Sequence, residues 1–196
     1  MRHALLTLLL IGCGPTVVRA PAHSSTIALS EDGRRIYVVN PDSDSVSILD
    51  ADAHSLIQEV RLDKPVEPSS DGSYYPGVMP RSIAVAPDGR TLYVTGQRSG
   101  RVYAIEVKTF AVRRSAPIGS EPFGLLISPD GRDLYVACAQ DAWLAKVDAA
   151  SLTLEGKVAV AAQPWALGWS VDGKTLLVTH FLGAQLTAIE RGITPG

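Results

Sequence analysis

The segment Ser128-Pro129-Asp130-Gly131-Arg132-Asp133-Leu134-Tyr135-Val136 decides the fold, because it joins a tight turn to the start of a β-strand. Proline presets the backbone of the first central turn position, aspartate takes the next, and glycine supplies the positive φ that closes a hairpin. The run Leu134-Tyr135-Val136 consists of residue types that are favoured in strands or in apolar cores. We therefore predict a β-hairpin centred on this turn.

The same turn occurs four times, and its aspartates are 56, 42 and 42 residues apart. The four copies are Ser30-Glu31-Asp32-Gly33-Arg34, Ala86-Pro87-Asp88-Gly89-Arg90, Ser128-Pro129-Asp130-Gly131-Arg132 and Ser170-Val171-Asp172-Gly173-Lys174. Apolar runs around each turn predict a first strand (26–29, 82–85, 124–127, 166–169), a second (36–39, 92–95, 134–137, 176–179) and a third (46–49, 102–105, 144–147, 186–189). A fourth, more polar strand closes three copies, at 56–62, 111–118 and 154–160.

Four strands in about 42 residues are typical of one blade of a β-propeller. We predict an all-β chain, a β-propeller of four blade repeats whose last blade is incomplete, and therefore a partial or open propeller. The repeats occupy residues 24–196, with blades at about 24–64, 79–119, 120–160 and 161–190 and an insertion at 63–78. A β-sandwich is the alternative architecture, but it does not explain the 42-residue recurrence.

The unit Ser-Pro-Asp-Gly-Arg-x-Leu-Tyr-Val resembles the YVTN family of bacterial and archaeal β-propeller repeats. The resemblance covers residues 24–190, and Tyr93-Val94-Thr95 supplies three of the four residues that give the family its name. The family's asparagine is present only at Asn40; Gly96, Cys138 and His180 replace it in the other copies. The resemblance implies an extracytoplasmic propeller, usually of seven blades, and it does not imply a single activity.

The fourth copy lacks its outer strand, which leaves an edge that can pair with another strand. We expect either that the chain is the N-terminal part of a larger propeller, or that it completes itself by self-assembly through the unfinished last blade. The repeat alone does not distinguish the two.

The first residues predict export. A basic start, Met1-Arg2-His3, precedes the apolar run 4–11, which is too short to cross a bilayer as a helix but fits the core of a signal peptide. The tetrad Leu10-Ile11-Gly12-Cys13 resembles a bacterial lipobox, which implies diacylation of Cys13. We predict a lipoprotein signal peptide at 1–12 and a linker at 13–23, and place the protein at the bacterial cell envelope, on the outer membrane, the cell surface or the periplasmic side. An ordinary signal peptide is the alternative.

The composition of the chain limits the kinds of molecule that it can be expected to bind. Eighteen basic residues face 20 acidic ones, and neither sign forms a long block, which argues against a nucleic-acid surface. The second cysteine, Cys138, lies in a strand-like run and has no partner if Cys13 is acylated, so no disulfide is expected. The expected partners are the membrane, through the lipid anchor, and an envelope protein or a small ligand.

The candidate binding face follows from blade geometry. Loops from an outer strand to the next inner strand and loops from the second to the third strand gather at one end of a propeller, where loops usually carry the function. Those loops and the insertion contain the candidate residues Tyr74, Tyr75, Arg81, Arg98, Phe123, Trp165 and His180. Each also has a structural interpretation: aromatic residues that plug the channel, solvated or paired arginines, and a hydrogen-bonded core histidine.

Familiar catalytic motifs are absent from the sequence, which has no Cys-x-x-Cys-His, His-Glu-x-x-His, Gly-x-Ser-x-Gly or phosphate-binding glycine loop. The four histidines show no metal-ligand spacing, so no metal and no cofactor are expected. We therefore expect a binding or scaffold module that is not an enzyme. The alternative is the propeller portion of a periplasmic oxidoreductase or electron-transfer protein whose haem or quinone centre lies outside this chain. A third possibility, a propeller lactonase, would need acidic and histidine ligands that converge on the channel, and these residues do not offer that set.

Overall fold

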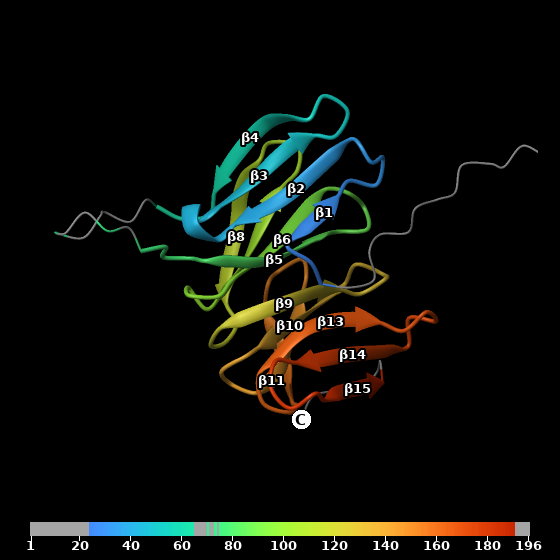
Figure 1. Ribbon diagram of the computed structural model, residues 1–196. Coiled ribbons are helices and arrows are strands. Elements are labelled where there is room, and N and C mark those ends of the chain that lie inside the picture. Colours follow the sequence, from blue (N-terminus) through green and yellow to red (C-terminus); the bar gives the residue numbers. More distant parts are fainter. Residues whose placement is uncertain (1–23, 65–69, 71–72, 74, 191–196) are drawn as a thin grey trace, which may run out of the picture.

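The computed structural model describes residues 24–64, 70, 73 and 75–190. It consists of four antiparallel sheets that follow one another in chain order, three with four strands and the last with three. Figure 1 shows this succession, from blade 1 at one end of the molecule to blade 4 at the other. The array is not closed into a ring, so the predicted open propeller of four blades is confirmed.

Each sheet runs from an innermost to an outer strand in sequence order. Blade 1 contains β1 (Ile27–Leu29), β2 (Arg35–Asn40), β3 (Ser45–Asp50) and β4 (Ser55–Arg61). Blade 2 contains β5 (Pro80–Val85), β6 (Thr91–Gly96), β7 (Arg101–Glu106) and β8 (Ala111–Pro117). Blade 3 contains β9 (Pro122–Ile127), β10 (Asp133–Cys138), β11 (Trp143–Asp148) and β12 (Leu154–Ala159). Blade 4 contains β13 (Pro164–Trp169), β14 (Thr175–His180) and β15 (Leu186–Glu190), and one short helical turn, η1, spans Pro41–Ser43.

The repeated turn forms as its residue types predict. Gly131 has φ +74°, and its N–H donates to the carbonyl of Ser128 at 2.8 Å. The Ser128 hydroxyl donates to Asp130 Oδ1 at 2.6 Å and also accepts from the N–H of Asp133 at 2.9 Å. One side chain therefore holds the turn aspartate and the first residue of the next strand, which explains why serine begins three of the four copies.

Apolar packing joins the blades at three seams. The buried cluster between blades 1 and 2 includes Tyr37, Ile48, Leu92, Val94 and Ile105. The cluster between blades 2 and 3 includes Tyr93, Val102, Leu125, Leu134 and Val136. The cluster between blades 3 and 4 includes Leu126, Leu144, Leu167, Leu176 and Val178. Both faces of the inner blades are covered in this way, which explains why their strands are apolar without strict alternation.

Polar contacts also cross the seams. The hydroxyl of Tyr93 in blade 2 donates to the backbone carbonyl of Ala149 in blade 3 at 3.0 Å. The indole N–H of Trp169 in blade 4 donates to the carbonyl of Ile127 in blade 3 at 2.9 Å. Tyr93 therefore contributes both buried apolar area and one hydrogen bond that fixes the orientation of blade 3 relative to blade 2.

The residues just before β1 link two blades that are not neighbours. The N–H of Ser24 donates to the carbonyl of Leu167 in β13, and the N–H of Ile83 in β5 donates to the carbonyl of Ser25, both at 2.8 Å. A Cβ at Gly124 of β9, which lies between them, would stand 3.3 Å from Ser24 Oγ and 2.4 Å from the Trp165 carbonyl oxygen. Glycine is required here because the backbone of β13 approaches it too closely for a Cβ atom. The pair Ser24-Ser25, which we call the strap, thus connects the inner strands of blades 2 and 4.

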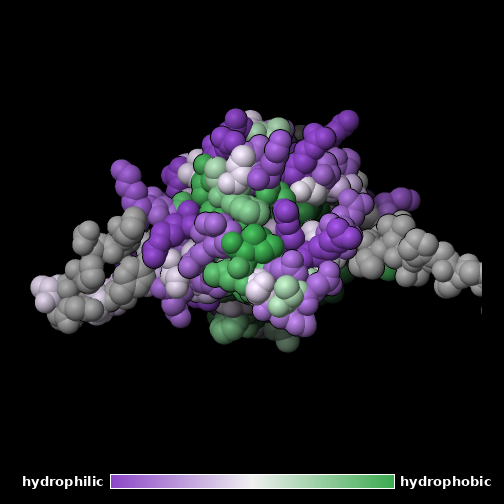
Figure 2. Space-filling model, turned by 90° about the horizontal axis from the view of Figure 1, so that it is seen from above, coloured by the Kyte–Doolittle hydropathy of each residue, from purple (hydrophilic) through white to green (hydrophobic). Residues whose placement is uncertain are grey.

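The two ends of the array expose apolar side chains. Figure 2 looks onto the blade 1 end and shows apolar surface bordered by hydrophilic residues; blade 1 exposes Ile27, Leu29, Leu56 and Ile57. At the opposite end β15 pairs only with β14 among the described strands, and Leu186 is 62% exposed. These faces expose the kind of apolar side chain that is buried between neighbouring blades elsewhere in the array. No helix within the described ranges is long and apolar enough to cross a membrane.

We predict that Gly131→Val destabilises the fold by about 2 kcal/mol or more, because a β-branched residue is strained at positive φ. The matched control is Gly131→Asn, since either new Cβ stands 3.1 Å from Pro87 Cδ while asparagine tolerates the left-handed region. Urea unfolding followed by circular dichroism measures both variants. Equal midpoints for the two would contradict the role assigned to φ.

Candidate functional site

The loops that enter the inner strands and the loops between second and third strands lie at one end of the blades, which we call the loop face. The Asp-Gly turns lie at the other end, the turn face. Three of the candidate residues, Arg81, Phe123 and Trp165, are the second residues of β5, β9 and β13. All three fall where the register with the adjacent strand shifts. A bulge re-aims its side chains, and here it occurs once in each of three successive blades.

Threonine hydroxyls support two of these bulges. Thr95 Oγ1 accepts the N–H of Ser82 at 3.1 Å and donates to the carbonyl of Phe123 in the next blade at 2.7 Å. Thr179 Oγ1 accepts the N–H of Ala166 at 3.2 Å. The hydroxyls replace bonds that the interrupted ladders cannot make, so the bulge positions are held rigidly.

The three bulge residues and one loop residue form a continuous row. The Phe123 and Trp165 rings are stacked with centroids 3.5 Å apart, and the Trp165 and Phe181 centroids are 4.8 Å apart. The Arg81 guanidinium carbon lies 5.1 Å from the Phe123 ring centroid, and its Nε donates to Gln97 Oε1 at 2.6 Å. The structure therefore brings together Arg81, Phe123 and Trp165. It adds Phe181, which is 63% exposed.

A second arginine–aromatic pair lies at the insertion. The Arg98 guanidinium carbon is 5.9 Å from the ring centroid of Tyr75, which is 58% exposed. Tyr74 lies outside the described residues, and so does Cys13. Among the described residues no ring or cation–π contact joins this pair to the aromatic row, so the two are separate parts of the loop face.

The C-terminal end of the insertion is held by one buried carboxylate, that of Asp44, which is 5% exposed. It accepts the backbone N–H groups of Gly77 at 2.6 Å, Val78 at 3.0 Å and Met79 at 2.8 Å. Asp44 also has a left-handed backbone conformation, with φ 51°, which fits a turn residue. The triple contact is an additional function, which fixes the chain just before it enters β5.

His180 is placed in the protein interior. It is 8% exposed; Nδ1 lies 3.1 Å from the carbonyl of Ala162, and Nε2 lies 2.8 Å from Thr187 Oγ1. Both ring nitrogens are therefore occupied by protein groups. This geometry is that of a structural histidine that joins the entry of β13 to β15.

Cys138 is also buried, and burial raises the pKa of its thiol to about 11. The thiol is therefore neutral at physiological pH and is not an activated nucleophile. Within the described ranges no group of three or more histidine, cysteine, aspartate or glutamate side chains could hold a metal ion.

The chemistry of the row suits one type of ligand. The flat faces of Phe123, Trp165 and Phe181 can cover a ring, and the guanidinium of Arg81 can donate hydrogen bonds to oxygen atoms that carry negative charge. These groups come from three different blades, so they form a rigid surface rather than a flexible loop.

Comparisons with known proteins agree with this architecture. The family model described as "Lactonase, 7-bladed beta-propeller" matches residues 7–116, more than half of the chain. Hydrazine synthase of Kuenenia stuttgartiensis has a similar structure, with a TM-score of 0.73 and 24% identity over 92% of this chain and 49% of that chain. A putative 6-phosphogluconolactonase of Bacteroides uniformis gives a TM-score of 0.70 and 19% identity over 93% of this chain and 55% of that one. No curated protein sequence matches the chain.

At these identities the structural matches show the fold alone. The chain spans about half the length of the solved structures that it matches. The family match covers blades 1 and 2 and leaves blades 3 and 4 outside.

The expectation that the chain is not an enzyme is wrong. It rested on the lack of catalytic motifs in the sequence, and the match to a family of lactonases contradicts it. The physical reason is that a propeller assembles a site from single residues of separate blades, so no contiguous motif needs to exist.

We predict that Asp44→Ala loosens the end of the insertion, because three N–H groups lose their carboxyl acceptor, and a hydrogen bond to a charged group contributes about 1.5–3 kcal/mol. Hydrogen exchange measured by mass spectrometry should show faster exchange at Gly77, Val78 and Met79. Asp44→Asn, which keeps one acceptor oxygen, should fall between the variant and the native protein. Unchanged exchange at these three amides would refute the anchoring role.

Proposed function

Because the chain belongs to the seven-bladed β-propeller lactonase family, we propose that it forms part of the substrate-binding propeller of a lactonase-type hydrolase. The reaction adds water across the ring ester: the acyl carbon–oxygen bond breaks, and the products are a carboxylic acid and a hydroxyl group. The observation that carries the proposal is the row Arg81–Phe123–Trp165–Phe181 on the loop face.

Each member of the row has a task in this proposal. The aromatic faces pack against the lactone ring and exclude water from one side of it. The guanidinium of Arg81 donates to the carbonyl oxygen, where negative charge develops as water attacks, or to an acidic substituent of the ring. The Arg81 Nε–Gln97 bond of 2.6 Å and the Phe123 ring hold this guanidinium in place before substrate arrives.

The substrate class follows from the same groups. A ring with one apolar face and at least one anionic or strongly polar substituent satisfies both the aromatic row and the arginine. The similar Bacteroides uniformis protein is described as a putative 6-phosphogluconolactonase, whose name implies a phosphorylated sugar lactone. This supports an acidic sugar lactone as the first substrate to test.

The alternative, a propeller portion of a periplasmic oxidoreductase, stays a prediction. The similarity to hydrazine synthase is below 25% identity and supports the fold alone. A Soret absorption band in the natively purified protein would favour that alternative over a lactonase.

We predict that Arg81→Gln lowers kcat/KM for acidic lactones by about tenfold to a hundredfold, because charge-assisted hydrogen bonds contribute about 1.5–3 kcal/mol. Hydrolysis is measured as acid release in a pH-stat with the full chain. Arg98→Gln is the matched control, since it removes one loop-face charge outside the row. Native-like rates for Arg81→Gln, or a protein that neither binds nor hydrolyses any lactone, would overturn the proposal.

The cellular location is also a proposal. The run 4–11 and the tetrad ending at Cys13 support an exported protein that is anchored in the cell envelope by two acyl chains. The loop face then meets a small ligand or an envelope protein outside the cytoplasm.

Labelling with radioactive palmitate tests the anchor. We expect the native protein to incorporate label and to remain in the membrane fraction, and Cys13→Ser to lose both properties. Membrane-bound, unlabelled Cys13→Ser protein together with unlabelled native protein would show that the anchor is not a lipid on this residue.

A further inference from the structure

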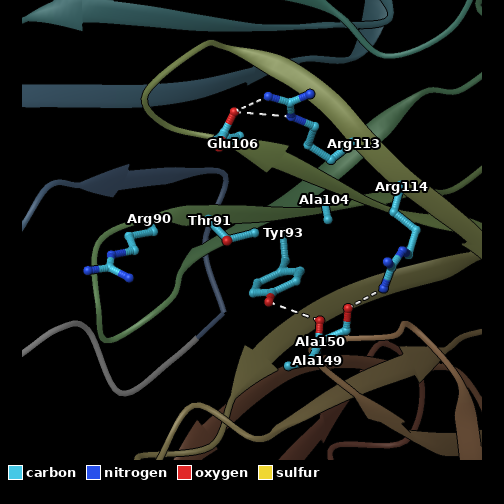
Figure 3. Close-up of a pocket in the computed structure, with 9 residues that line it drawn as sticks. All are labelled: Arg90, Thr91, Tyr93, Ala104, Glu106, Arg113, Arg114, Ala149 and Ala150. Atoms are coloured by element: carbon cyan, nitrogen blue, oxygen red, sulfur yellow. Dashed lines mark hydrogen bonds and ion pairs between the residues drawn. The ribbon is translucent and has the colours of Figure 1, made fainter.

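A pocket of about 250 Å³ lies at the seam between blades 2 and 3, on the turn face. Figure 3 labels its lining residues, which come from the end of the turn before β6 (Arg90), from β6, β7 and β8, and from the turn after β11. It lies at the opposite end of the blades from the aromatic row and shares no residue with it. The pocket is therefore distinct from the candidate lactone site.

One rung of the blade 2 sheet forms its floor. Tyr93 pairs with Ala104, and Ala104 pairs with Arg114, across β6, β7 and β8. The corresponding rungs of the other complete blades are Tyr37–Ile48–Gln58 and Tyr135–Lys146–Gly156. Only blade 2 combines a small central residue, which leaves a hollow, with an arginine on the outer strand. The pocket therefore lies at the rung in which blade 2 differs from blades 1 and 3.

Blade 3 fixes the pocket from the other side. The Tyr93 hydroxyl donates to the carbonyl of Ala149 at 3.0 Å, and Arg114 Nη1 donates to the carbonyl of Ala150. Figure 3 shows both contacts and places Arg90 and Arg114 on either side of the Tyr93 ring. Because each contact joins the two blades, the hollow is a fixed part of the seam rather than a gap that can collapse.

The charge of the lining is positive. It contains Arg90, Arg113 and Arg114 and the single carboxylate of Glu106. Arg113 Nε donates to Glu106 Oε2 at 3.1 Å, and Thr109 also bonds this oxygen. The Thr109 hydrogen bond, and after it that of Arg113, lower the pKa of Glu106, so this carboxylate is ionised and neutralises one arginine. Two positive charges of the lining remain, and the carboxylates of Asp88 and Asp148 lie beside the lining, near Tyr93.

The guanidinium groups of Arg90 and Arg114 have N–H groups that are available to a ligand. Within the described part of the chain, the Arg90 guanidinium makes no hydrogen bond or ion pair. In the Arg114 guanidinium, only Nη1 donates a hydrogen bond, to the carbonyl of Ala150. A planar guanidinium presents two parallel N–H groups that match two oxygens of a phosphate. The pocket thus offers unused donors and a net charge of the sign that a phosphate group requires.

The strap indicates what lies near this pocket. Ser25 pairs with Ile83 in antiparallel direction, and β5 runs from the loop face to the turn face. Ser24 therefore lies on the side of Ser25 that is nearer to the turn face. Ten residues separate Cys13 from Ser24 and span at most about 36 Å when fully extended. An acyl anchor at Cys13, as proposed above, would keep the turn face within reach of the lipid headgroups.

We propose that the pocket between blades 2 and 3 binds a phosphate group through Arg90 and Arg114. Free phosphate and the headgroup of an anionic phospholipid carry the same chemistry, and the position of the strap favours the headgroup. The proposal is independent of lactone hydrolysis, because it uses the opposite end of the blades.

The first test is calorimetric titration of the full chain in detergent with inorganic phosphate. We expect saturable binding that Arg90→Gln and Arg114→Gln each weaken about tenfold. The matched control is Arg132→Gln, which removes the arginine at the corresponding turn position of blade 3 and should change binding less than about twofold. Arg90→Gln keeps the test decisive if Arg114→Gln impairs folding, since the Arg90 side chain holds no described neighbour in place.

The second test reconstitutes the same proteins in vesicles of phosphatidylethanolamine, with or without one quarter phosphatidylglycerol. Protection of the amides of Ala104 and Ala150 from hydrogen exchange is the readout. If these amides are protected only when phosphatidylglycerol is present, and Arg90→Gln loses this protection, the ligand is the lipid headgroup. If the protein binds phosphate in the first test but shows no such protection, the ligand is free phosphate. Absence of both, or equal behaviour of Arg90→Gln and Arg132→Gln, overturns the site.

Discussion

Each blade of this protein buries its apolar side chains against a neighbouring sheet, blades 2 and 3 on both faces and blades 1 and 4 on one, and the rest of the structure depends on this packing. The strands of blades 2 and 3 bury apolar side chains on each side, so a sheet outside the array would expose both. Burial of one valine or leucine contributes about 1.5–3 kcal/mol, whereas one seam hydrogen bond contributes about 1 kcal/mol. Apolar packing therefore holds the blades together, and bonds such as Tyr93–Ala149 decide how they are oriented.

The fold could be predicted from the sequence because its signals are local. The turn from Ser128 to Arg132 and the strand after it carry their own geometry, and the 42-residue recurrence multiplies the evidence. Contacts between residues that are far apart in the sequence have no comparable local signal in the sequence. The triple bond of Asp44 to the insertion and the pairing of the strap with β5 and β13 join residues that are tens to more than a hundred positions apart.

The candidate site was predictable in outline only. Position in the repeat placed Arg81, Phe123 and Trp165 at one end of the blades, and the structure brings them together. The repeat could not show that bulges turn these side chains, nor that Phe181 extends the row. The arginine pocket was missed because its signal is a single rung, Tyr93–Ala104–Arg114, in which one blade differs from its neighbours. Comparing equivalent rungs would have revealed it.

The strap has a mechanical consequence. A chain end that leaves a propeller from an outer strand peels away one hydrogen bond after another under tension. Here the N-terminal chain leads to Ser24 and Ser25, whose bonds to Leu167 and Ile83 lie between the inner strands of blades 2 and 4. A pulling force applied at that end loads two blades at once and must separate the middle of the assembly before its periphery.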